Sequence, residues 1–596
     1  MFKTLLPSPF ELARRLGRLL FLCGLVGVIA GLGAIGFMWM LEGMRHYALG
    51  VAAGYYPPGP GGEAPLFAPT GEPFRRWVLL FVPAIGGLVS GLIVFTLAPE
   101  AEGHGTDSAI AAYHFRRGEI RARVPLVKAV ASAITIGTGG SGGREGPIAQ
   151  IGAGFGSVVA RALKLSIYER RILMAAGMAA GIGAIFHAPL AGALFAAEVL
   201  YKEMDMEYEV IVPSIISSVI AYAVFATKFG WNPLFQTPGY VFEKPSQLLP
   251  YFILALIVAG TAWLFIQIFY GVRDSFRSIP LPNHVKPALG GLFVGIIGFF
   301  LPDALGTGYG VVQGAFAGRF GVSILLAVAL GKMLTTSFSI ATGGSGGVFG
   351  PSVVIGGALG GAVGQVMQLV FPGMGIQPGA FVLVGMAGFF AAAANTPIST
   401  VIMVSEMTGN YHLLVPSMWV CIIAYLVVRR STIYEKQIPT RMDAPSHVGE
   451  MMGGILKRLT VADALGNGGR NHVITVSESA TLHELLEKFT SSKHTCFPVV
   501  NDEGKLIGVV DGKDLRHTIS EAGFIDHLII AKELAIDSPT VTPHEDLYSV
   551  VHKMVVSRSD ELVVVDEADP RKPIGILTRG DLVAAYDRQF LAEGMA

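Results

Sequence analysis

The sequence predicts an all-α, multi-pass membrane body made of two inverted halves with broken half-helices, followed by an α/β tail. Hydrophobic residues make up 52% of the 596-residue chain and charged residues only 15%, against about 25% charged in ordinary soluble domains. The segment TGGSGGREGP at 138–147 returns as TGGSGGVFGP at 342–351, and residues 186–198 are echoed by residues 394–406. Interrupted hydrophobic segments at corresponding positions of two halves are typical of the binding site of a membrane transporter.

The helices of the body follow from its apolar segments. Several segments are shorter than the roughly 17 residues that a straight helix needs to cross a bilayer, so we expect half-spanning helices that meet inside the protein. A short amphipathic surface helix is expected at 10–20, and a Pro/Gly-rich loop at 54–75. The expected apolar segments lie at about 19–41, 77–97, 125–137, 147–165, 172–200, 208–227, 250–271, 286–301, 322–340, 351–371, 378–394, 397–407 and 413–428.

Basic residues flank both ends of the body. They are Arg14, Arg15 and Arg18 before the first segment, and Arg429, Arg430 and Lys436 after the last. Because positive residues gather on the cytoplasmic side, both termini of this integral cell-membrane protein are predicted to be cytoplasmic. The first segment is too long for a signal peptide and is expected to be retained.

Beyond about residue 445 the composition becomes that of a soluble domain. Strand-like runs such as CFPVV alternate with helical runs such as TLHELLEKF, and this pattern occurs twice. The tail therefore predicts two α/β modules.

Composition also excludes several functions. The 44 basic and 44 acidic residues balance, which argues against nucleic acid as a partner. Cys23, Cys421 and Cys496 lie far apart, so neither a disulfide framework nor a metal site is expected. No nucleophile–base pair or HExxH motif is present, so we do not expect an enzyme.

The repeated Gly-rich segment predicts an anion site. Residues 137–142 match G-x-G-x-x-G, but no soluble βαβ unit surrounds them, and Arg144-Glu145 stands where a P-loop needs Lys-Ser/Thr. Glycines followed by Gly-Pro instead place helix N-termini, whose backbone N–H groups attract anions. The structural alternative is that the glycines serve close helix packing.

Glu145 is the most informative single residue. A carboxylate inside an apolar region is costly and indicates a function. At the mouth of an anion site, ionised Glu145 would occupy the site as a tethered competitor, and protonated Glu145 would leave it. The structural alternative is an ion pair with Arg144.

Three loops resemble the anion site of the CLC chloride channel and transporter family. They are GHGTD at 103–107, GREGP at 143–147 and GVFGP at 347–351, and the tail resembles the paired CBS domains of many CLC proteins. The resemblance implies a CLC-type fold and a homodimer with one pore per subunit. The implied organisation is a membrane domain at 1–440 with repeats at roughly 77–227 and 285–430, a linker at 441–458, and CBS domains at 459–521 and 528–590.

The same resemblance implies roles for individual residues. Glu145 resembles the gating glutamate of the family, Val348 and Phe349 would donate backbone N–H groups to a central anion, and Tyr434 resembles the tyrosine that closes the inner side. The structural alternative for Tyr434 is an interfacial belt position. The full set expected at the anion site is His104, Gly105, Arg144, Glu145, Gly146, Val348, Phe349 and Tyr434.

The first loop departs from the family pattern. The family usually has a serine where this chain has His104, and a proline where it has Asp107. An imidazole N–H can also donate to an anion, and its charge changes near neutral pH. Alternatively, His104 only packs or caps the loop.

A second departure follows residues 186–198. Antiporters of the family carry a second, proton-passing glutamate where this chain has Val199, as the channels of the family do. Glu198 is expected to anchor helix packing, as is its repeat partner Glu406. The acidic residues that remain as substitutes for the missing glutamate are Glu203, Asp205 and Glu207.

In the tail, GILTRGD at 575–581 resembles the CBS pattern in which a hydroxyl and a carboxylate bind a ribose. The resemblance assigns these roles to Thr578 and Asp581, so an adenine nucleotide site is a hypothesis. The first copy keeps Asp514 but has Asp511 where the hydroxyl belongs. The alternative is a purely structural, dimerising module.

The predicted function is a chloride channel that conducts passively, is gated by Glu145, and also responds to voltage and pH. The alternative is proton-coupled chloride antiport. From another class, a CBS-containing magnesium transporter would need clustered carboxylates at membrane depth. Chloride or another small anion is the expected substrate, membrane lipid the surroundings, and no cofactor is required.

Overall fold

The structure is a computed structural model that describes residues 9–466, 471, 473–492, 494–512 and 529–592. The chain divides into two compact units, Met1–Ser446 and His447–Ala596. The first unit is helical and the second is α/β, which confirms the predicted fold class.

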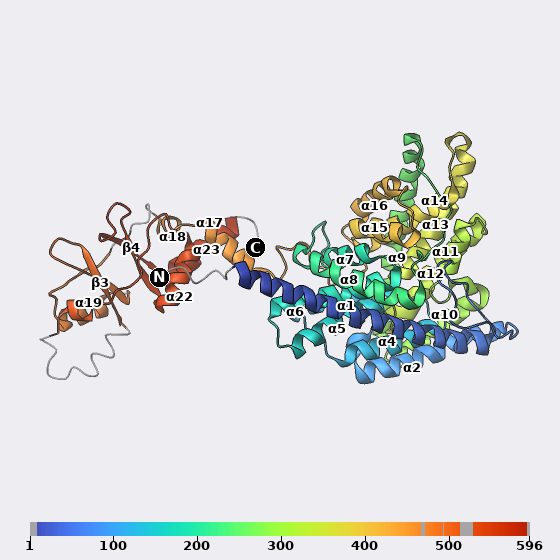
Figure 1. Cartoon of the computed structure of the whole chain (residues 1–596), viewed down its shortest axis with the longest axis horizontal. Helices are drawn as coiled ribbons and strands as arrows, with labels where there is room; N and C mark the ends of the chain where they lie inside the picture. The colour runs from blue at the N-terminus through green and yellow to red at the C-terminus, as the bar shows by residue number, and fades with distance from the viewer. Residues whose placement is uncertain (1–8, 467–470, 472, 493, 513–528, 593–596) are drawn as a thin grey trace. The chain divides into compact units, whose positions relative to one another are not determined.

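Within the described residues of the membrane unit, six helical segments are long and apolar enough to cross a bilayer. They are Gly17–Val51, Arg76–Leu97, Tyr208–Phe229, Pro245–Ser278, Val322–Ala341 and Phe349–Val370. The α-helices of the unit (Figure 1) are α1 (Pro9–Arg45), α2 (Val82–Leu97), α3 (Thr106–Phe115), α4 (Arg123–Gly137), α5 (Glu145–Ala162), α6 (Ile167–Phe186), α7 (Pro189–Glu198), α8 (Tyr208–Phe229), α9 (Leu248–Ser278), α10 (Lys286–Phe300), α11 (Tyr309–Phe316), α12 (Val322–Thr336), α13 (Phe349–Val370), α14 (Pro378–Ala394), α15 (Pro397–Thr408) and α16 (Leu414–Val428).

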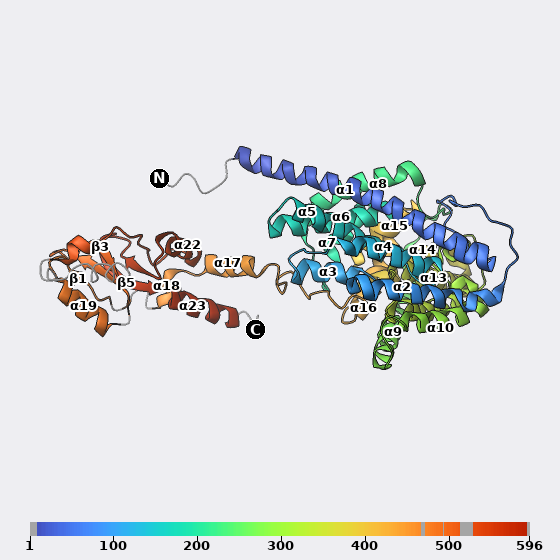
Figure 2. The ribbon, with the colours of Figure 1, turned by 90° about the horizontal axis from the view of Figure 1, so that it is seen from below.

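The first helix differs from its prediction. A separate surface helix was expected at 10–20, but α1 is one continuous helix of 37 residues. Figures 1 and 2 show it as a long rod beside α4, α5, α6 and α8, with which it is in contact. No proline lies between the amphipathic and the apolar segment, and a single glycine, Gly17, is tolerated inside a helix, so nothing in the sequence ends the helix there.

The two halves of the body have the same order of helices. Helices α2 to α8 correspond to α10 to α16, and both sets contain a short helix that follows a sharp break. The predicted single segment at 172–200 is in fact two helices, because His187 adopts a left-handed φ of 57° and Pro189 begins α7. Asn395, with a φ of 56°, and Pro397 make the same break between α14 and α15. Proline begins a helix easily but cannot continue one.

Polar side chains join the halves in symmetric pairs. Ser132 bonds Ser345 at 2.9 Å, and Ser141 bonds Thr336 at 2.8 Å. Each pair maps onto the other through the 204-residue offset of the Gly-rich repeat. The two repeats therefore meet around a local two-fold axis.

Two glutamates make a second symmetric contact. Glu198, at the end of α7, accepts the backbone N–H groups of Ile398 and Ser399 in the first turn of α15, at 2.9 and 2.7 Å. Glu406, on α15, accepts the backbone N–H groups of Leu190 and Ala191 in the first turn of α7, with Ala191 at 2.8 Å. Each carboxylate thus caps the positive end of the other helix. This arrangement supports the anchoring role expected for both residues.

In the described part of the second unit, the strands form two small sheets. Strand β1 (Val476–Ser477) pairs in parallel with β2 (Cys496–Val500), which pairs antiparallel with β3 (Leu506–Asp511). Strands β4 (Glu561–Val565) and β5 (Pro573–Thr578) form an antiparallel pair. The helices among the described residues of this unit are α17 (Val448–Arg458), α18 (Val461–Leu465), α19 (Leu482–Ser491), α21 (Ala531–Leu534), α22 (Leu547–Ser557) and α23 (Arg579–Ala592).

Candidate anion site

A small cavity lies where the two halves of the membrane unit meet. Its volume is about 10 Å³, close to the least space that holds one water molecule. The lining residues come from α3, α5, α6, α7, α13, α15 and the segment after α16. They are Thr106, Glu145, Gly146, Ala149, Ile182, Phe186, Phe195, Phe349, Met403 and Tyr434.

Two helix N-termini converge on this cavity. Helix α5 begins at Glu145 and α13 begins at Phe349. The loops before them are hydrogen-bonded to each other. The backbone N–H of Gly143 donates to the Gly347 carbonyl, and the N–H of Gly347 donates to the Gly143 carbonyl, both at 2.7 Å. A Cβ on Gly347 would lie 2.7 Å from the Gly143 carbonyl oxygen, so a glycine is needed for this approach. Unpaired N–H groups at two helix starts favour an anion between them.

Glu145 is buried and is held by two donors. The hydroxyl of Tyr309, in the first turn of α11, donates to one carboxylate oxygen. The backbone N–H of Gly350, in the first turn of α13, donates to the other at 3.2 Å. The carboxylate therefore already occupies part of the space where the two helix starts would attract an anion.

Arg144 points elsewhere. Its guanidinium makes a two-pronged ion pair with Glu63, at 2.6 and 2.9 Å, and both side chains are almost completely buried, with exposed fractions of 3% and 10%. Glu63 lies on the Pro/Gly-rich loop at 54–75, which was not expected to contribute to the site. The structural alternative of an ion pair between Arg144 and Glu145 is thus replaced by a pair with Glu63.

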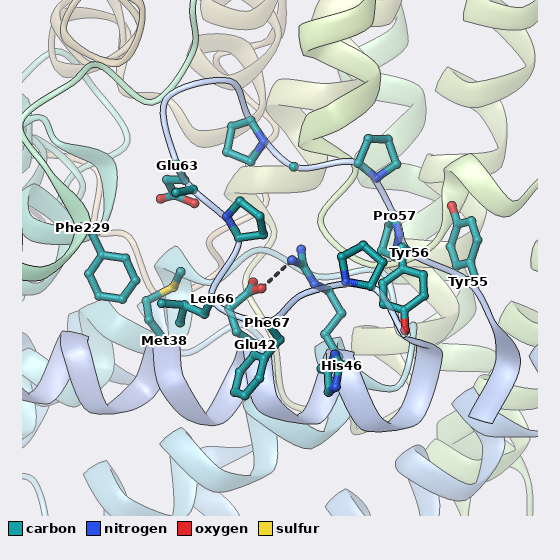
Figure 3. Close-up of a pocket in the computed structure, with 17 residues that line it drawn as sticks. Met38, Glu42, His46, Tyr55, Tyr56, Pro57, Glu63, Leu66, Phe67 and Phe229 are labelled. Carbon is teal, nitrogen blue, oxygen red and sulfur yellow. Dashed lines mark hydrogen bonds and ion pairs between the residues drawn. The ribbon is translucent and has the colours of Figure 1, made fainter. Parts of the chain in front are cut away.

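The loop that carries Glu63 covers a larger pocket of about 280 Å³. Figure 3 shows the loop passing over α1, with Glu42 on that helix, His46 in the helical turn just after it, and Tyr55, Tyr56 and Phe67 on the loop. Glu42 pairs with Arg45 one turn along the helix. The acidic groups of this pocket therefore each have an arginine partner.

The first loop places Thr106 at the cavity, rather than the predicted His104 and Gly105. The His104 ring is buried, its Nε2 lies 3.4 Å from Asp107, and its centre lies 5.2 Å from that of Tyr434. Nδ1 of this ring has no hydrogen-bond partner among the described residues. Gly105, the residue just before α3, has a positive φ of 84°, which glycine adopts readily.

The remaining predicted residues lie near the cavity. Gly146, Phe349 and Tyr434 line it. Val348 is the buried residue just before the first turn of α13. The structure thus gathers Glu145, Gly146, Phe349 and Tyr434 around one cavity and leaves Arg144 at the Glu63 pair.

Sequence reasoning missed Thr106 and Tyr309. Thr106 begins α3 and Tyr309 begins α11, so they hold the same place in the two halves. The sequence does mark this shared position, because GHGTD at 103–107 corresponds in the repeat to GTGYG at 306–310, which matches Thr106 with Tyr309.

The acidic residues after Val199 differ in burial. Val199 itself is fully buried, and Glu203 is exposed. Glu207 is fully buried, accepts a hydrogen bond from the Tyr201 hydroxyl at 2.7 Å, and lies 3.2 Å from the Arg441 guanidinium. Of these two glutamates, only Glu207 has the burial that a proton-carrying carboxylate needs.

In the second unit, Thr578 and Asp581 bond each other. The Thr578 hydroxyl donates to the Asp581 carboxylate at 2.7 Å, and each side chain also accepts a backbone N–H from the other residue. This is a capping box at the start of α23. The corresponding Asp514 of the first copy lies outside the described residues.

Comparison with known proteins extends these findings. The sequence profile described as "Voltage gated chloride channel" matches residues 86–429, and the profile described as "CBS domain" matches residues 469–521 and 531–588. The chain is 30% identical over 423 residues to the H(+)/Cl(−) exchange transporter ClcA of Salmonella agona, covering 69% of this chain and 85% of that protein. It is 29% identical over 432 residues to a putative chloride channel protein, ClcB-like, of Ralstonia nicotianae, covering 71% and 97%.

A solved structure shares the fold. The crystal structure of a slow cyanobacterial Cl−/H+ antiporter superposes with a TM-score of 0.61 at 24% identity, covering 69% of this chain and 94% of the other. The matched profile spans more than half of the chain. It includes α5, α13 and the Gly-rich loops before them, which surround the candidate anion site. The chain therefore belongs to the voltage-gated chloride channel family, a family of membrane transporters and channels rather than enzymes, and carries a pair of CBS domains.

Proposed function

We propose that this protein exchanges chloride for protons across the membrane, with Glu145 serving both ions. The observation that carries the proposal is the position of Glu145. Its carboxylate lines the same cavity as the N-termini of α5 and α13, and the volume of that cavity is close to the least that holds one water molecule. A chloride ion and the ionised carboxylate exclude each other there.

This exclusion links the two ions chemically. An ionised Glu145 occupies the anion site, and the side chain becomes a poor competitor once it takes up a proton. Each proton that binds Glu145 therefore lets the carboxyl group leave the site, and the site is then open to chloride. A cycle that alternates between these two occupants moves chloride and protons in opposite directions.

The comparisons support exchange better than the passive conduction that Val199 predicts. The Salmonella agona relative is named an exchange transporter and the structural neighbour an antiporter. Passive conduction remains the second candidate, because Val199 cannot carry a proton. The family match leaves the magnesium-transporter alternative without support.

Exchange needs a path by which protons move between Glu145 and the cytoplasmic side of the membrane. Val199 occupies the position where antiporters of the family have a glutamate. We infer that Glu207 takes this role, because it is the buried carboxylate closest in sequence after Val199 and is bonded to the Tyr201 hydroxyl. Glu203 is exposed and does not offer the same isolation from solvent.

The wider setting of the proposal comes from charge and family. The arginines at both ends of the membrane unit favour cytoplasmic termini, and the family implies a homodimer with one anion path per subunit. CBS domains commonly bind adenine nucleotides, so Thr578 and Asp581 are proposed to contribute to such a site.

Proton uptake driven by a chloride gradient tests the proposal. Purified protein in liposomes loaded with chloride is diluted into low-chloride buffer, and the external pH is followed. We expect protons to move against their gradient into the liposomes with the wild-type protein, and no proton movement with Glu145→Gln, which still passes chloride. Chloride efflux from the wild type without proton uptake would favour the passive channel instead.

A further inference from the structure

The Glu145 carboxylate has a partner that was not expected from the sequence. The Tyr309 hydroxyl donates to it, and the Gly350 N–H donates to its other oxygen. Tyr309 is fully buried and comes from the second half of the molecule, whereas Glu145 comes from the first. The contact therefore crosses the interface between the two repeats.

Tyr309 is held firmly in place. Lys332, on α12, is fully buried and donates to the carbonyls of Ala304, Leu305 and Gly306 in the loop before α11, with Gly306 at 2.5 Å. The ring of Phe235 packs edge-on against the Tyr309 ring, with centroids 5.5 Å apart. The hydroxyl thus has a fixed direction toward Glu145.

Arg144 completes the surroundings of Tyr309. Its guanidinium carbon lies 5.5 Å from the centre of the Tyr309 ring, and its two terminal nitrogens donate to Glu63. Because Glu63 already engages the guanidinium, the charged group near Glu145 is directed away from the carboxylate. The hydroxyl and the Gly350 N–H are then the hydrogen-bond donors to Glu145 among the described residues outside its own helix.

We propose that Tyr309 is a positioning residue that holds Glu145 in the anion site and so sets how strongly the carboxylate competes with chloride. This inference rests on the proposed role of Glu145. A hydrogen bond to a charged group in a buried site strengthens the bound position of that group. Removing the hydroxyl should therefore weaken the competitor and tighten the apparent binding of chloride.

The experiment measures the chloride dissociation constant by isothermal titration calorimetry on full-length, detergent-purified protein at alkaline pH. Four proteins are compared, namely wild type, Glu145→Gln, Tyr309→Phe and the double variant. Glu145→Gln removes the competitor and sets the limit of tight binding. Tyr309→Phe should lower the dissociation constant by about tenfold, or to the limit set by Glu145→Gln where that limit is smaller. The double variant should bind chloride as Glu145→Gln does.

Tyr240→Phe is the matched control. This change also removes a buried tyrosine hydroxyl bonded to α11, since Tyr240 donates to the Phe316 carbonyl at 2.8 Å. Within the part of the chain that the structure describes, Tyr240 makes no hydrogen bond to Glu145. It should leave the dissociation constant at the wild-type value. A shift equal to that of Tyr309→Phe would mean that any loosening of α11 produces the effect, and the inference would be wrong.

The remaining outcomes separate the inference from the function on which it rests. Chloride affinity that is unchanged in Glu145→Gln would overturn the role of Glu145 itself. A normal response to Glu145→Gln with no response to Tyr309→Phe would overturn only the role of Tyr309. An equal shift from Tyr309→Phe in both backgrounds would place its action on the cavity rather than on the carboxylate, and would also overturn it.

A second replacement protects the test from a folding defect. Replacing Tyr309 by 3-fluorotyrosine keeps the ring and the hydroxyl but makes the hydroxyl a stronger hydrogen-bond donor. The carboxylate should then compete better, and the apparent chloride affinity should fall relative to wild type. Unchanged or tighter chloride binding by this protein would contradict the proposal.

Discussion

At the scale of single residues, the site depends on one carboxylate and its neighbours. Glu145 shares a cavity of about 10 Å³ with the starts of α5 and α13, and Tyr309 and Gly350 donate to it. Arg144, its neighbour in sequence, is paired with Glu63. The chemistry of the site therefore reduces to whether the carboxylate or an anion occupies the cavity.

Glu145→Gln tests that statement through pH. The amide cannot ionise and does not compete as an anion, so chloride flux should persist at alkaline pH, where wild-type flux falls. Chloride efflux from liposomes, measured across a series of pH values for both proteins, provides the comparison. A variant that keeps the wild-type pH dependence would show that a different group controls the site.

Glu207→Gln tests the proton path. Glu207 is fully buried and bonded to Tyr201, whereas Glu203 is exposed, so only the first change should reduce proton movement. We expect Glu207→Gln to slow chloride-driven proton uptake at least tenfold more than it slows chloride flux, a difference of about 1.4 kcal/mol or more in barrier height. Glu203→Gln is the matched control and should behave as wild type. Equal effects of the two changes would remove Glu207 from the path.

At the scale of elements, the helix starts at the Gly-rich loops were predictable, whereas the break at His187 and the contacts across the repeats were not. The duplicated TGGSGG segment, with Gly-Pro after each copy, predicted two helix starts facing each other, and α5 and α13 begin there. Residues 172–200 read as one apolar segment, because the left-handed turn at His187 leaves no mark in hydrophobicity. Glu63 was not predicted because it reaches the site from a loop distant in sequence, and local patterns carry no information about such contacts. Tyr309 was marked only by the correspondence of GTGYG at 306–310 with GHGTD at 103–107.

The reciprocal caps of α7 and α15 give a prediction at this scale. Glu198→Ala leaves two backbone N–H groups and the Ser399 hydroxyl without their carboxylate, at a cost of about 1–3 kcal/mol for each buried group that stays unpaired. The melting temperature of the protein should fall, and Glu406→Ala should lower it by a similar mechanism in the other half. Proton coupling should survive Glu198→Ala in the molecules that stay folded, as measured by proton uptake at low temperature. Loss of coupling without loss of stability would make Glu198 a proton carrier instead of an anchor.

The second unit allows a controlled test of nucleotide binding. Thr578 and Asp581 form a capping box, and so do Thr460 and Asp463 at the start of α18. Asp581→Ala and Asp463→Ala should each cost about 1 kcal/mol as lost caps. If Asp581 also binds a ribose, AMP or ATP should raise the melting temperature of wild type and Asp463→Ala, but not that of Asp581→Ala. A nucleotide shift that persists in Asp581→Ala would leave the residue with its capping role alone.

The pH of that test matters for the control. The bond from the Thr460 hydroxyl, together with a backbone hydrogen bond, holds the pKa of Asp463 below its usual range. A depressed carboxylate pKa adds stability that is present at neutral pH and is lost as the pH falls through the lowered value. Melting curves recorded at neutral pH therefore keep the Asp463 cap in its ionised form.

At the scale of the whole molecule, the family and the fold agree with the sequence-based expectations. The proposed mode of transport, exchange, differs from the passive conduction that was the first prediction. The GREGP and GVFGP loops were sufficient to predict the membrane fold, and the alternating runs of the tail predicted its α/β modules. Val199 predicted passive conduction, whereas the proposed exchange assigns the proton path to Glu207. Glu207, eight residues further along, becomes a candidate only once its burial is known.

The reversal potential under a pH gradient tests chloride/proton exchange most directly. Purified protein is reconstituted in liposomes or planar bilayers with equal chloride on both sides, and a tenfold proton gradient, about 1.4 kcal/mol per proton, is imposed. Exchange predicts that the wild-type reversal potential moves away from zero in the direction set by the proton gradient, and that Glu145→Gln returns it to zero. A wild-type reversal potential that stays at the chloride equilibrium value would contradict exchange and identify a passive chloride channel.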